Sequence, residues 1–307
     1  MKPIIDTEFK SLFQLLERFP NEQACIDHLT KLRWNGNVVS PFDPSSKVYV
    51  CKGNKYKCKN TGKYFNVKTG TLFENTKLPL VKWFMAIYLV TSNPKGITSP
   101  QLAKNIGVIQ QTGWFLLHRI RNCFGIQVEE ELSGEVEVDE TYVGGKNKNR
   151  HKNKKVEGSQ GRSSKDKTPV MGMVQRGGKL IAMKVENVSG STLVPNVSNN
   201  VHSSASVYTD EWIGYKGLSK IYDHSFIKHN EDEYVRGRVH TNTIEGFWSL
   251  FKRRIVGIHH FVSKKHLQRY VDESVNYYNL RNETAHYRFN SMLSNTEHRL
   301  RYKDLVA

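Results

Sequence analysis

Apolar residues at the start of the chain recur with the spacing of an amphipathic helix. These positions are Phe9, Phe13, Leu16 and Phe19. Pro20 and Asn21 break the pattern, and a second helix is predicted from Glu22 to about Leu32. Residues 1–33 are therefore predicted to form a helical N-terminal segment.

The pattern changes between residues 34 and 75, where short β-type runs alternate with turn dipeptides. This segment is predicted to be a small β-rich module. The apolar run that follows, from Pro79 to Val90, is longer than a usual strand. It therefore predicts a buried helix.

Residues 96–124 carry the pattern of a helix-turn-helix, within a helical region of residues 76–128. Ser99 is a suitable N-cap, Pro100 fits the first helical position, and Gly107 can form the turn. In such units the second helix enters the major groove of DNA. Its outward residues are predicted to be Gln110, Gln111, Thr112, His118, Arg119 and Arg121, with Trp114, Leu117 and Ile120 inward. An ordinary helical hairpin is the alternative.

From residue 134 the pattern alternates with the period of a strand, and GEVEVDETYV predicts a strand that ends in an acidic pair. Residues 144–168 are polar and rich in Lys and Arg, which fits either a solvated linker or a DNA-contacting loop. The elements predicted next are two strands joined at residues 176–178, a helix near residue 192, a strand ending at residue 210, a strand at HSFIKH, a helix from about residue 241 and a helix over residues 264–280.

Three acidic residues stand out by their positions in these elements. Asp139 and Asp210 are predicted at strand ends, and Glu245 in the helix after residue 241. The order of elements is that of a ribonuclease H-like α/β fold, in which adjacent parallel strands bring the two aspartates together and the helix lays the glutamate across them. Taken singly, each acid also fits a turn, a cap or a solvated helix position. Two divalent ions about 4 Å apart, held by such carboxylates, can activate a nucleophile and stabilise a leaving oxygen in phosphodiester cleavage.

The helix that carries Glu245 also has basic residues. At helical spacing Asn242, Glu245 and Lys252 fall on roughly one face. Lys252 is predicted to hold a DNA phosphate or, alternatively, to be an ordinary surface lysine. Arg253 and Arg254 are predicted to extend the basic surface, whereas Trp248 and Phe251 are predicted to enter the core.

The net charge of the chain indicates what kind of partner it binds. The chain has 46 Lys and Arg against 29 Asp and Glu, a net charge of +17, which favours a nucleic acid over a membrane as partner. No stretch is long and apolar enough for a membrane span, and the N-terminal sequence has no signal-peptide core. The four scattered cysteines indicate the reducing cytoplasm rather than a disulfide framework.

Several motifs together resemble DDE transposases of bacterial insertion sequences, in the group related to Merlin elements. The motifs are EVDETYVGGK, VYTDEWIGY and HTNTIEGFWSLFKRR, supported by YKCKNTGKYFNVKTGTLF and KWFMAIYLVTSNPKGITSPQLAKNIGV. The resemblance covers nearly the whole chain. It implies a ribonuclease H-like catalytic domain (here residues 129–290, before a C-terminal tail of 291–307) and cleavage and strand transfer at element ends. It also implies two Mg²⁺ ions (or Mn²⁺), double-stranded DNA as partner, and a homodimer or larger assembly.

By position, Asp139, Asp210 and Glu245 match the catalytic and metal-binding triad of that family. Asn242 is the rival third ligand, because some members place Asn in that role. We prefer Glu245, since a carboxylate binds Mg²⁺ better than an amide does and since Lys252 follows at the expected spacing. A non-catalytic DNA-binding descendant and another ribonuclease H-like nuclease are the alternative functions.

The β-rich module departs from the family. Relatives carry a zinc ribbon with two CxxC pairs, a strong zinc motif. Here the four ligand positions hold Ser40, Asp43, Cys58 and Thr61. The module is therefore predicted to persist without zinc, held by the apolar residues Val48, Tyr49, Tyr56 and Phe65.

Overall fold

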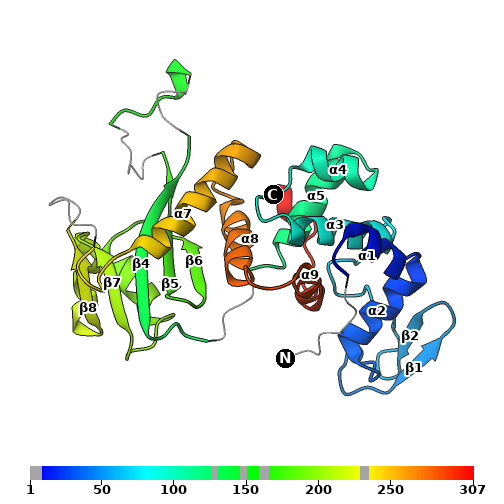
Figure 1. Ribbon diagram of the computed structural model, residues 1–307. Helices are drawn as coiled ribbons and strands as arrows, with labels where there is room; N and C mark the ends of the chain where they lie inside the picture. The colour runs from blue at the N-terminus through cyan, green and yellow to red at the C-terminus, as the bar shows by residue number, and fades with distance from the viewer. Residues whose placement is uncertain (1–8, 126–129, 146–150, 159–165, 229–234) are drawn as a thin grey trace. The chain divides into compact units, whose positions relative to one another are not determined.

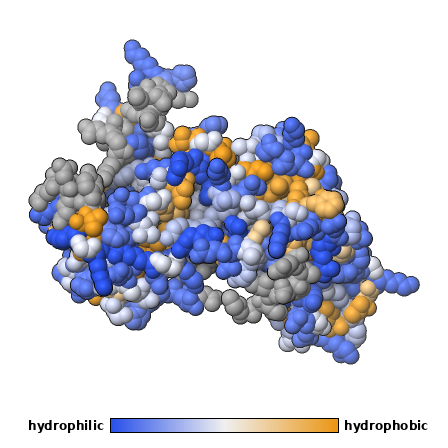
Figure 2. All heavy atoms as spheres, viewed as in Figure 1, coloured by the Kyte–Doolittle hydropathy of each residue, from blue (hydrophilic) through white to orange (hydrophobic). Residues whose placement is uncertain are grey.

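The computed structural model describes residues 9–125, 130–145, 151–158, 166–228 and 235–307. The chain divides into two compact units, Met1–Ile126 with Asn282–Ala307, and Gln127–Arg281 (Figure 1). Parts of the predicted basic loop, 146–150 and 159–165, lie outside the described residues. Hydrophilic residues cover much of the visible surface, as expected for a highly charged chain (Figure 2). In the described part of the chain, every helix is too short or too polar to cross a membrane.

The first unit is helical around one apolar helix. Its helices are α1 (Leu12–Arg18), α2 (Glu22–Trp34), α3 (Leu80–Ser92), α4 (Ser99–Ile106), α5 (Gln110–Arg121), α9 (Ala285–Ser294) and α10 (Tyr302–Val306). Helix α3 is apolar on most faces and packs against α1, α2, α4, α5 and α9. The buried helix predicted from the apolar run after Pro79 is confirmed, because only an element in the centre of a unit can bury so many faces.

Aromatic rings join the C-terminal residues to this unit. The Phe289 ring on α9 lies 5.4 Å from Phe84 on α3 and 5.3 Å from Phe9, between ring centroids. The catalytic domain was predicted to end at residue 290. In the structure, residues 282–290 belong to the first unit and pack with the N-terminal helices. The reason is the apolar face of α9, which is buried against the N-terminal helices.

The buried His28 belongs to a hydrogen-bond chain between α2 and α9. Its Nε2 lies 3.0 Å from Asn290 Oδ1, and Asn290 Nδ2 lies 3.0 Å from His286 Nε2. Burial lowers the pKa of His28 to about 4, and the charges of Arg18 and His286 act in the same direction. The ring is therefore neutral in the folded protein at neutral pH.

Acidification is expected to destabilise the protein through His28. The unfolded chain takes up this proton near pH 6.5, whereas the folded chain resists it until about pH 4, so the free energy of unfolding falls across that window. The loss amounts to about 2 kcal/mol at pH 5. Thermal unfolding at pH 7 and pH 5 measures it. His28→Gln keeps a donor for Asn290 and should show a smaller drop; an equal drop in both proteins would contradict the assignment.

The β-rich module forms a three-stranded antiparallel sheet. Its strands are β1 (Val48–Cys51), β2 (Lys55–Cys58) and β3 (Tyr64–Phe65), in the order β1-β2-β3. Phe65 is buried, and Val48 and Tyr56 pack against the core of the first unit. The predicted role of Tyr49 is wrong, because the residue is 42% exposed.

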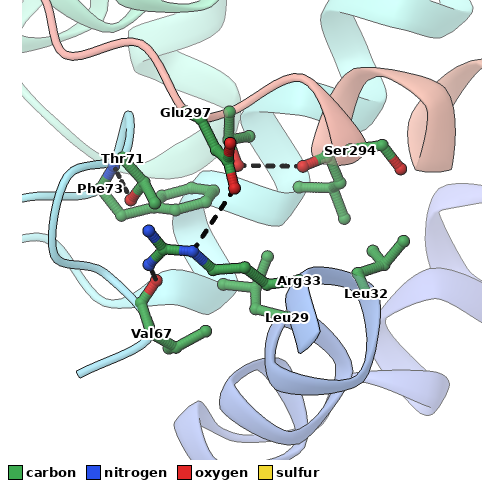
Figure 3. A pocket seen from close by; sticks show the side chains of 10 residues that line it. Leu29, Leu32, Arg33, Val67, Thr71, Phe73, Ser294 and Glu297 are labelled. Atoms are coloured by element: carbon green, nitrogen blue, oxygen red, sulfur yellow. Dashed lines mark hydrogen bonds and ion pairs between the residues drawn. The ribbon is translucent and has the colours of Figure 1, made fainter. Parts of the chain in front are cut away.

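Arg33 on α2 attaches the module to the helices. Its Nη1 donates hydrogen bonds to the carbonyl oxygens of Val67, at 3.0 Å, and Thr69, at 2.8 Å. Its Nε faces Glu297, 3.7 Å away, across a small pocket lined by both termini of the unit (Figure 3). The guanidinium satisfies carbonyl groups that follow β3, so this pocket has a structural explanation.

Polar contacts occupy the four positions at which the family resemblance implies zinc ligands. Ser40 Oγ accepts hydrogen bonds from the backbone N–H groups of Phe42, at 3.1 Å, and Asp43, at 3.4 Å. Asp43 Oδ2 accepts one from Asn60 Nδ2 at 2.8 Å. Burial raises the pKa of Cys58, but hydrogen bonds from Ser40 and other hydroxyls outweigh it and lower the pKa to about 6.

We expect the module to stay folded without zinc, because these hydrogen bonds link the loops that a metal would otherwise join. Metal analysis of the purified protein should find far less than one zinc per chain, and a chelator should leave the melting temperature unchanged. A structural zinc would instead make the fold depend on the metal. One tightly bound zinc per chain would show that the predicted loss of the site is wrong.

The second unit contains a five-stranded mixed sheet. Its strands are β4 (Glu135–Val143), β5 (Thr168–Gln175), β6 (Leu180–Lys184), β7 (Ser206–Asp210) and β8 (Asp223–Ile227). They lie in the order β6-β5-β4-β7-β8. The first three pair antiparallel, whereas β4, β7 and β8 are parallel. This mixed α/β sheet has the ribonuclease H-like order expected from the sequence.

Helices bury both faces of the sheet. These elements are α6 (Gly190–Ser198), the 3-10 segment η3 (Ile213–Lys220), α7 (Asn242–Arg254), the π-helical turn η5 (Ile255–His259) and α8 (Leu267–Asn279); a short 3-10 turn, η2 (Lys152–Lys154), follows β4. Side chains of α6 and η3 share one apolar core with the sheet, and those of α7 and α8 share the other. Val136, Val138 and Val207 face the first core, so the alternate residues of β4 and β7 face α7.

Candidate active site

Asp139 and Asp210 come together because β4 and β7 are adjacent and parallel. The register pairs Glu137 with Tyr208, two residues before each aspartate. Asp210 is the last residue of β7, as predicted. Asp139 is not at a strand end: β4 continues to Val143, because it keeps pairing with β5. Asp139 therefore lies mid-strand, beside the carboxyl end of β7.

Glu140 is a third acid in this cluster, which we call the acidic cluster: Asp139, Glu140 and Asp210. One carboxylate oxygen from each lies within 4.8 Å of the others. Tyr215 Oη donates a hydrogen bond of 2.8 Å to Glu140 Oε2. Strand alternation sends Glu140 to the opposite face from Asp139, so sequence reasoning left it out. The one signal for it is that it follows Asp139 directly.

Burial and neighbouring negative charge both disfavour the ionised form of Asp139 in the acidic cluster. Burial raises the pKa of Asp139 to about 8, and the negative charges of Glu140, Asp210 and Glu245 add to the shift. Asp210 Oδ1 is held by the backbone N–H of Trp212 at 3.0 Å. Fixed carboxylates that repel one another gain when a divalent cation binds between them.

Glu245 lies on the first turn of α7, outside the acidic cluster but near enough to raise the pKa of Asp139. Thr241 Oγ1 donates a hydrogen bond of 2.8 Å to Glu245 Oε1. Asn242 is the first residue of α7, on the same turn, and both side chains are exposed. The structure thus brings the two aspartates together and leaves Glu245 near them, with Asn242 on the same first turn of α7.

The predicted inward face of α7 is confirmed by burial. Trp248 is 4% exposed and Phe251 is 1% exposed. Trp248 also packs over Gly172 of β5, the residue that pairs with Asp139. The helix therefore lies close to the sheet at the level of the acidic cluster.

The basic end of α7 is only partly on the surface. Lys252 and Arg253 are exposed, as predicted. The predicted surface role of Arg254 is wrong, because its side chain is buried between α7 and α8. Its Nη1 donates a hydrogen bond of 2.6 Å to Ser274 Oγ, and its guanidinium lies 4.5 Å from the centroid of the Tyr277 ring.

The predicted helix-turn-helix corresponds to α4 and α5, with Gly107 in the left-handed conformation between them. The N-cap is Thr98 rather than Ser99, and its side chain accepts from Gln101 N. At the start of α5, Gln110 and Gln111 are exposed and Thr112 is half-buried.

The second half of α5 corrects the sequence prediction. His118, Arg119 and Arg121 are buried, at 1%, 6% and 1% exposure, so they do not face outward. Arg119 Nη2 donates to the carbonyl oxygen of Glu74 at 3.2 Å, and its guanidinium lies 5.3 Å from the Trp83 ring centroid. These side chains pack inside the helical unit, which leaves the N-terminal turn of α5 as its exposed polar part.

Comparisons with known proteins agree with this geometry. A family model described as ISXO2-like transposase domain matches residues 131–279. An uncharacterized protein in transposable element ISH50 of Halobacterium salinarum is 30% identical over 270 residues, 83% of this chain and 90% of that protein.

Two solved structures also align at low similarity. The simian T-cell lymphotropic virus intasome in complex with PP2A regulatory subunit B56 gamma gives a TM-score of 0.27 at 11% identity, over 61% of this chain and 66% of that one. The Mos1 strand transfer complex gives 0.28 at 13% identity, over 71% and 79%. On the strength of the family model and the insertion-sequence relative, the chain belongs to the DDE transposases of insertion sequences with an ISXO2-like transposase domain.

Proposed function

We propose that this transposase cleaves DNA at the ends of its insertion sequence and joins those ends to target DNA, with Mg²⁺ held at Asp139, Asp210 and Glu245. The observation that carries the proposal is the acidic cluster in a chain with a net charge of +17. Acids gathered in one place within a basic protein suit a site that binds metal and a DNA phosphate together.

The donor set fits a hard divalent cation. Carboxylate oxygens are the ligands that Mg²⁺ and Mn²⁺ prefer, and Asp139 and Asp210 present them from rigid strands. When bound, the ions would supply Lewis-acid activation of the attacking oxygen and stabilisation of the leaving oxygen.

The residues of the chain then align the reactants. Asp139 and Asp210 would hold the metal at the carboxyl end of β7, with Glu245 as a further ligand from α7, and so set where the scissile phosphate lies. Lys252 and Arg253 are exposed on the same helix and contact flanking phosphates. Water attacks the phosphorus atom and the 3′ oxygen leaves as a hydroxyl. That hydroxyl then attacks a target phosphate in the same site, so that a new phosphodiester bond forms and the 3′ oxygen of the target strand leaves as a hydroxyl.

DNA ends are held by the exposed start of α5, where Gln110, Gln111 and Thr112 offer donors and acceptors for base edges. We assign the β-rich module, residues 34–75, to the same task. Double-stranded DNA, as terminal repeats and as target, is the partner, and two or more chains assemble on paired ends in the cytoplasm.

Strand transfer with the element's own ends tests the proposal and its third ligand. Glu245→Ala is expected to reduce Mg²⁺-dependent transfer more than about 100-fold, since even partners outside the first coordination shell contribute 10–100-fold. Asn242→Ala is expected to stay within about tenfold of wild type, because its amide is the weaker ligand. The measurement is the rate of joined product at saturating DNA.

The opposite order of effects would assign the third ligand to Asn242. Wild-type protein that binds its ends but never joins them in Mg²⁺ or Mn²⁺ would overturn the proposed activity and favour a non-catalytic DNA-binding role.

A further inference from the structure

A buried carboxylate lies directly beneath the first turn of α7. Glu137 in β4 is fully buried, as are its apolar neighbours Val136 and Val138. It precedes Asp139 by two residues and therefore shares its face of the sheet, the face that α7 covers. A buried acid needs partners that satisfy both oxygens.

The partners of Glu137 come mainly from α7 itself. Its Oε2 accepts the backbone N–H groups of Thr243, at 2.8 Å, and Ile244, at 3.0 Å. Its Oε1 accepts Thr243 Oγ1 at 2.9 Å and Arg176 Nε at 2.7 Å. A strand residue thus takes the two backbone donors that a helix normally presents to its own N-cap side chain.

The residue at the N-cap is thereby free for another task. Thr241 makes no capping hydrogen bond, although threonine commonly does so. Its hydroxyl instead donates to Glu245 Oε1 at 2.8 Å. If Thr241 had to cap the helix, its oxygen would turn towards the backbone N–H groups and away from Glu245.

Arg176 forms an ion pair with Glu137 and balances its charge. Its Nη1 donates to the carbonyl oxygen of Arg238 at 2.8 Å, and its Nη2 to that of His240 at 3.0 Å. The segment that leads into α7 is therefore tied to the same carboxylate, and the buried ion pair fixes where the helix begins.

We infer that Glu137 is a positioning residue: by capping α7 from within β4, it sets the place of Glu245 relative to Asp139. The part of the inference that concerns metal rests on the proposed function. The part that concerns the helix stands on the contacts alone, so the two can fail separately.

The test compares Glu137→Gln with Glu135→Gln in the full-length protein. The first variant keeps the size of the side chain but replaces the carboxylate with an amide. Its N–H₂ group cannot accept the hydrogen bonds of Arg176 or α7, and its oxygen accepts them more weakly. The second removes a carboxylate from the same strand that also binds Arg176, at 3.2 Å, without touching α7. Hydrogen exchange of the peptide over residues 241–251 reports on the helix, and Mn²⁺ titration reports on the site.

Glu137→Gln is expected to speed exchange in the first turn of α7 and to weaken Mn²⁺ binding about tenfold, the range for residues that orient a ligand. Glu135→Gln should do neither. In a Glu245→Ala background the Glu137→Gln substitution should cost no further Mn²⁺ affinity, because it acts through Glu245.

Unchanged exchange in Glu137→Gln, or losses of Mn²⁺ affinity that add in the double variant, would overturn the inference. If Glu137→Gln does not fold, Thr241→Val and Thr243→Val replace it; each removes one hydroxyl contact, and unaltered Mn²⁺ affinity in both would overturn it equally. Absence of Mn²⁺ binding in wild type would instead count against the proposed function, while the exchange data would still decide the role of Glu137.

Discussion

Asp139→Asn is expected to abolish strand transfer and, at the same time, to raise the melting temperature of the metal-free protein. The carboxylate lies within the acidic cluster, where its ionised form is disfavoured by burial and by the charges of Glu140 and Asp210. Asparagine has nearly the same shape and no charge. The substitution therefore removes the cost of holding an ionisable acid in this buried, negatively charged surrounding.

The expected rise in melting temperature follows from the pKa of Asp139, which is raised from 3.8 to about 8 in the folded protein. Between these values the folded chain holds a proton that the unfolded chain has released, so the free energy of unfolding falls as the pH rises through this window. At pH 7 most of the penalty is present, and it becomes complete once the pH passes about 8. Because Asp139 is partly exposed, we expect asparagine to recover about 2 kcal/mol, or several degrees in melting temperature.

Divalent cations should reverse the order of the two proteins. Mg²⁺ binds the folded wild type and stabilises it by mass action, whereas Asp139→Asn has lost a ligand and should respond little. Calorimetry with and without Mg²⁺ measures this, and Asp223→Asn, an exposed carboxylate that begins β8, serves as the control. A variant that melts lower than wild type without metal would show that Asp139 is stabilising, and the cluster would need another explanation.

The sequence was sufficient for the order of elements and for the pairing of the two aspartates. Strand periodicity and turn signals place Asp139 and Asp210 on two separate strands, and their adjacency follows from the parallel pairing of β4 with β7. The end of β4 was harder to predict. Polar residues such as Glu140 and Thr141 resemble a strand end, yet they continue the pairing with β5.

Buried charges were the main source of error. Arg119 and Arg254 have the spacing of outward residues, but an aromatic ring and a hydrogen-bond acceptor from a distant part of the sequence take each guanidinium inside. Such partners depend on tertiary packing, which helical periodicity does not contain. Glu137 was missed for the same reason, since its partners on α7 lie more than a hundred residues away.

Gly172→Ala is expected to damage both stability and activity, because this glycine lets α7 approach the sheet beside Asp139. A Cβ atom at residue 172 would lie 2.6 Å from Trp248 Cζ2 and 2.9 Å from Ile244 Cδ1. Both side chains are buried, so the helix or the indole must move. Overpacking of this kind costs about 1–3 kcal/mol of unfolding free energy.

The effect on activity should exceed the effect on folding. Ile244 immediately precedes Glu245, and a displacement of about 1 Å in a positioned catalytic group can cost about 100-fold in rate. We therefore expect strand transfer to fall about 100-fold while the variant remains folded. Thermal unfolding and the rate of joined product measure the two effects.

A second substitution identifies the cause. Trp248→Phe removes the Cζ2 and Cη2 atoms that crowd residue 172, so Gly172→Ala with Trp248→Phe should recover much of the activity lost by Gly172→Ala alone. Gly246→Ala, on α7 with nothing within 4 Å of the new Cβ, is the stability control and should stabilise the helix by up to about 1 kcal/mol. If the double variant were no more active than Gly172→Ala, the indole would not be what moves α7. The clash with Ile244 would then account for the loss, since it remains in both proteins.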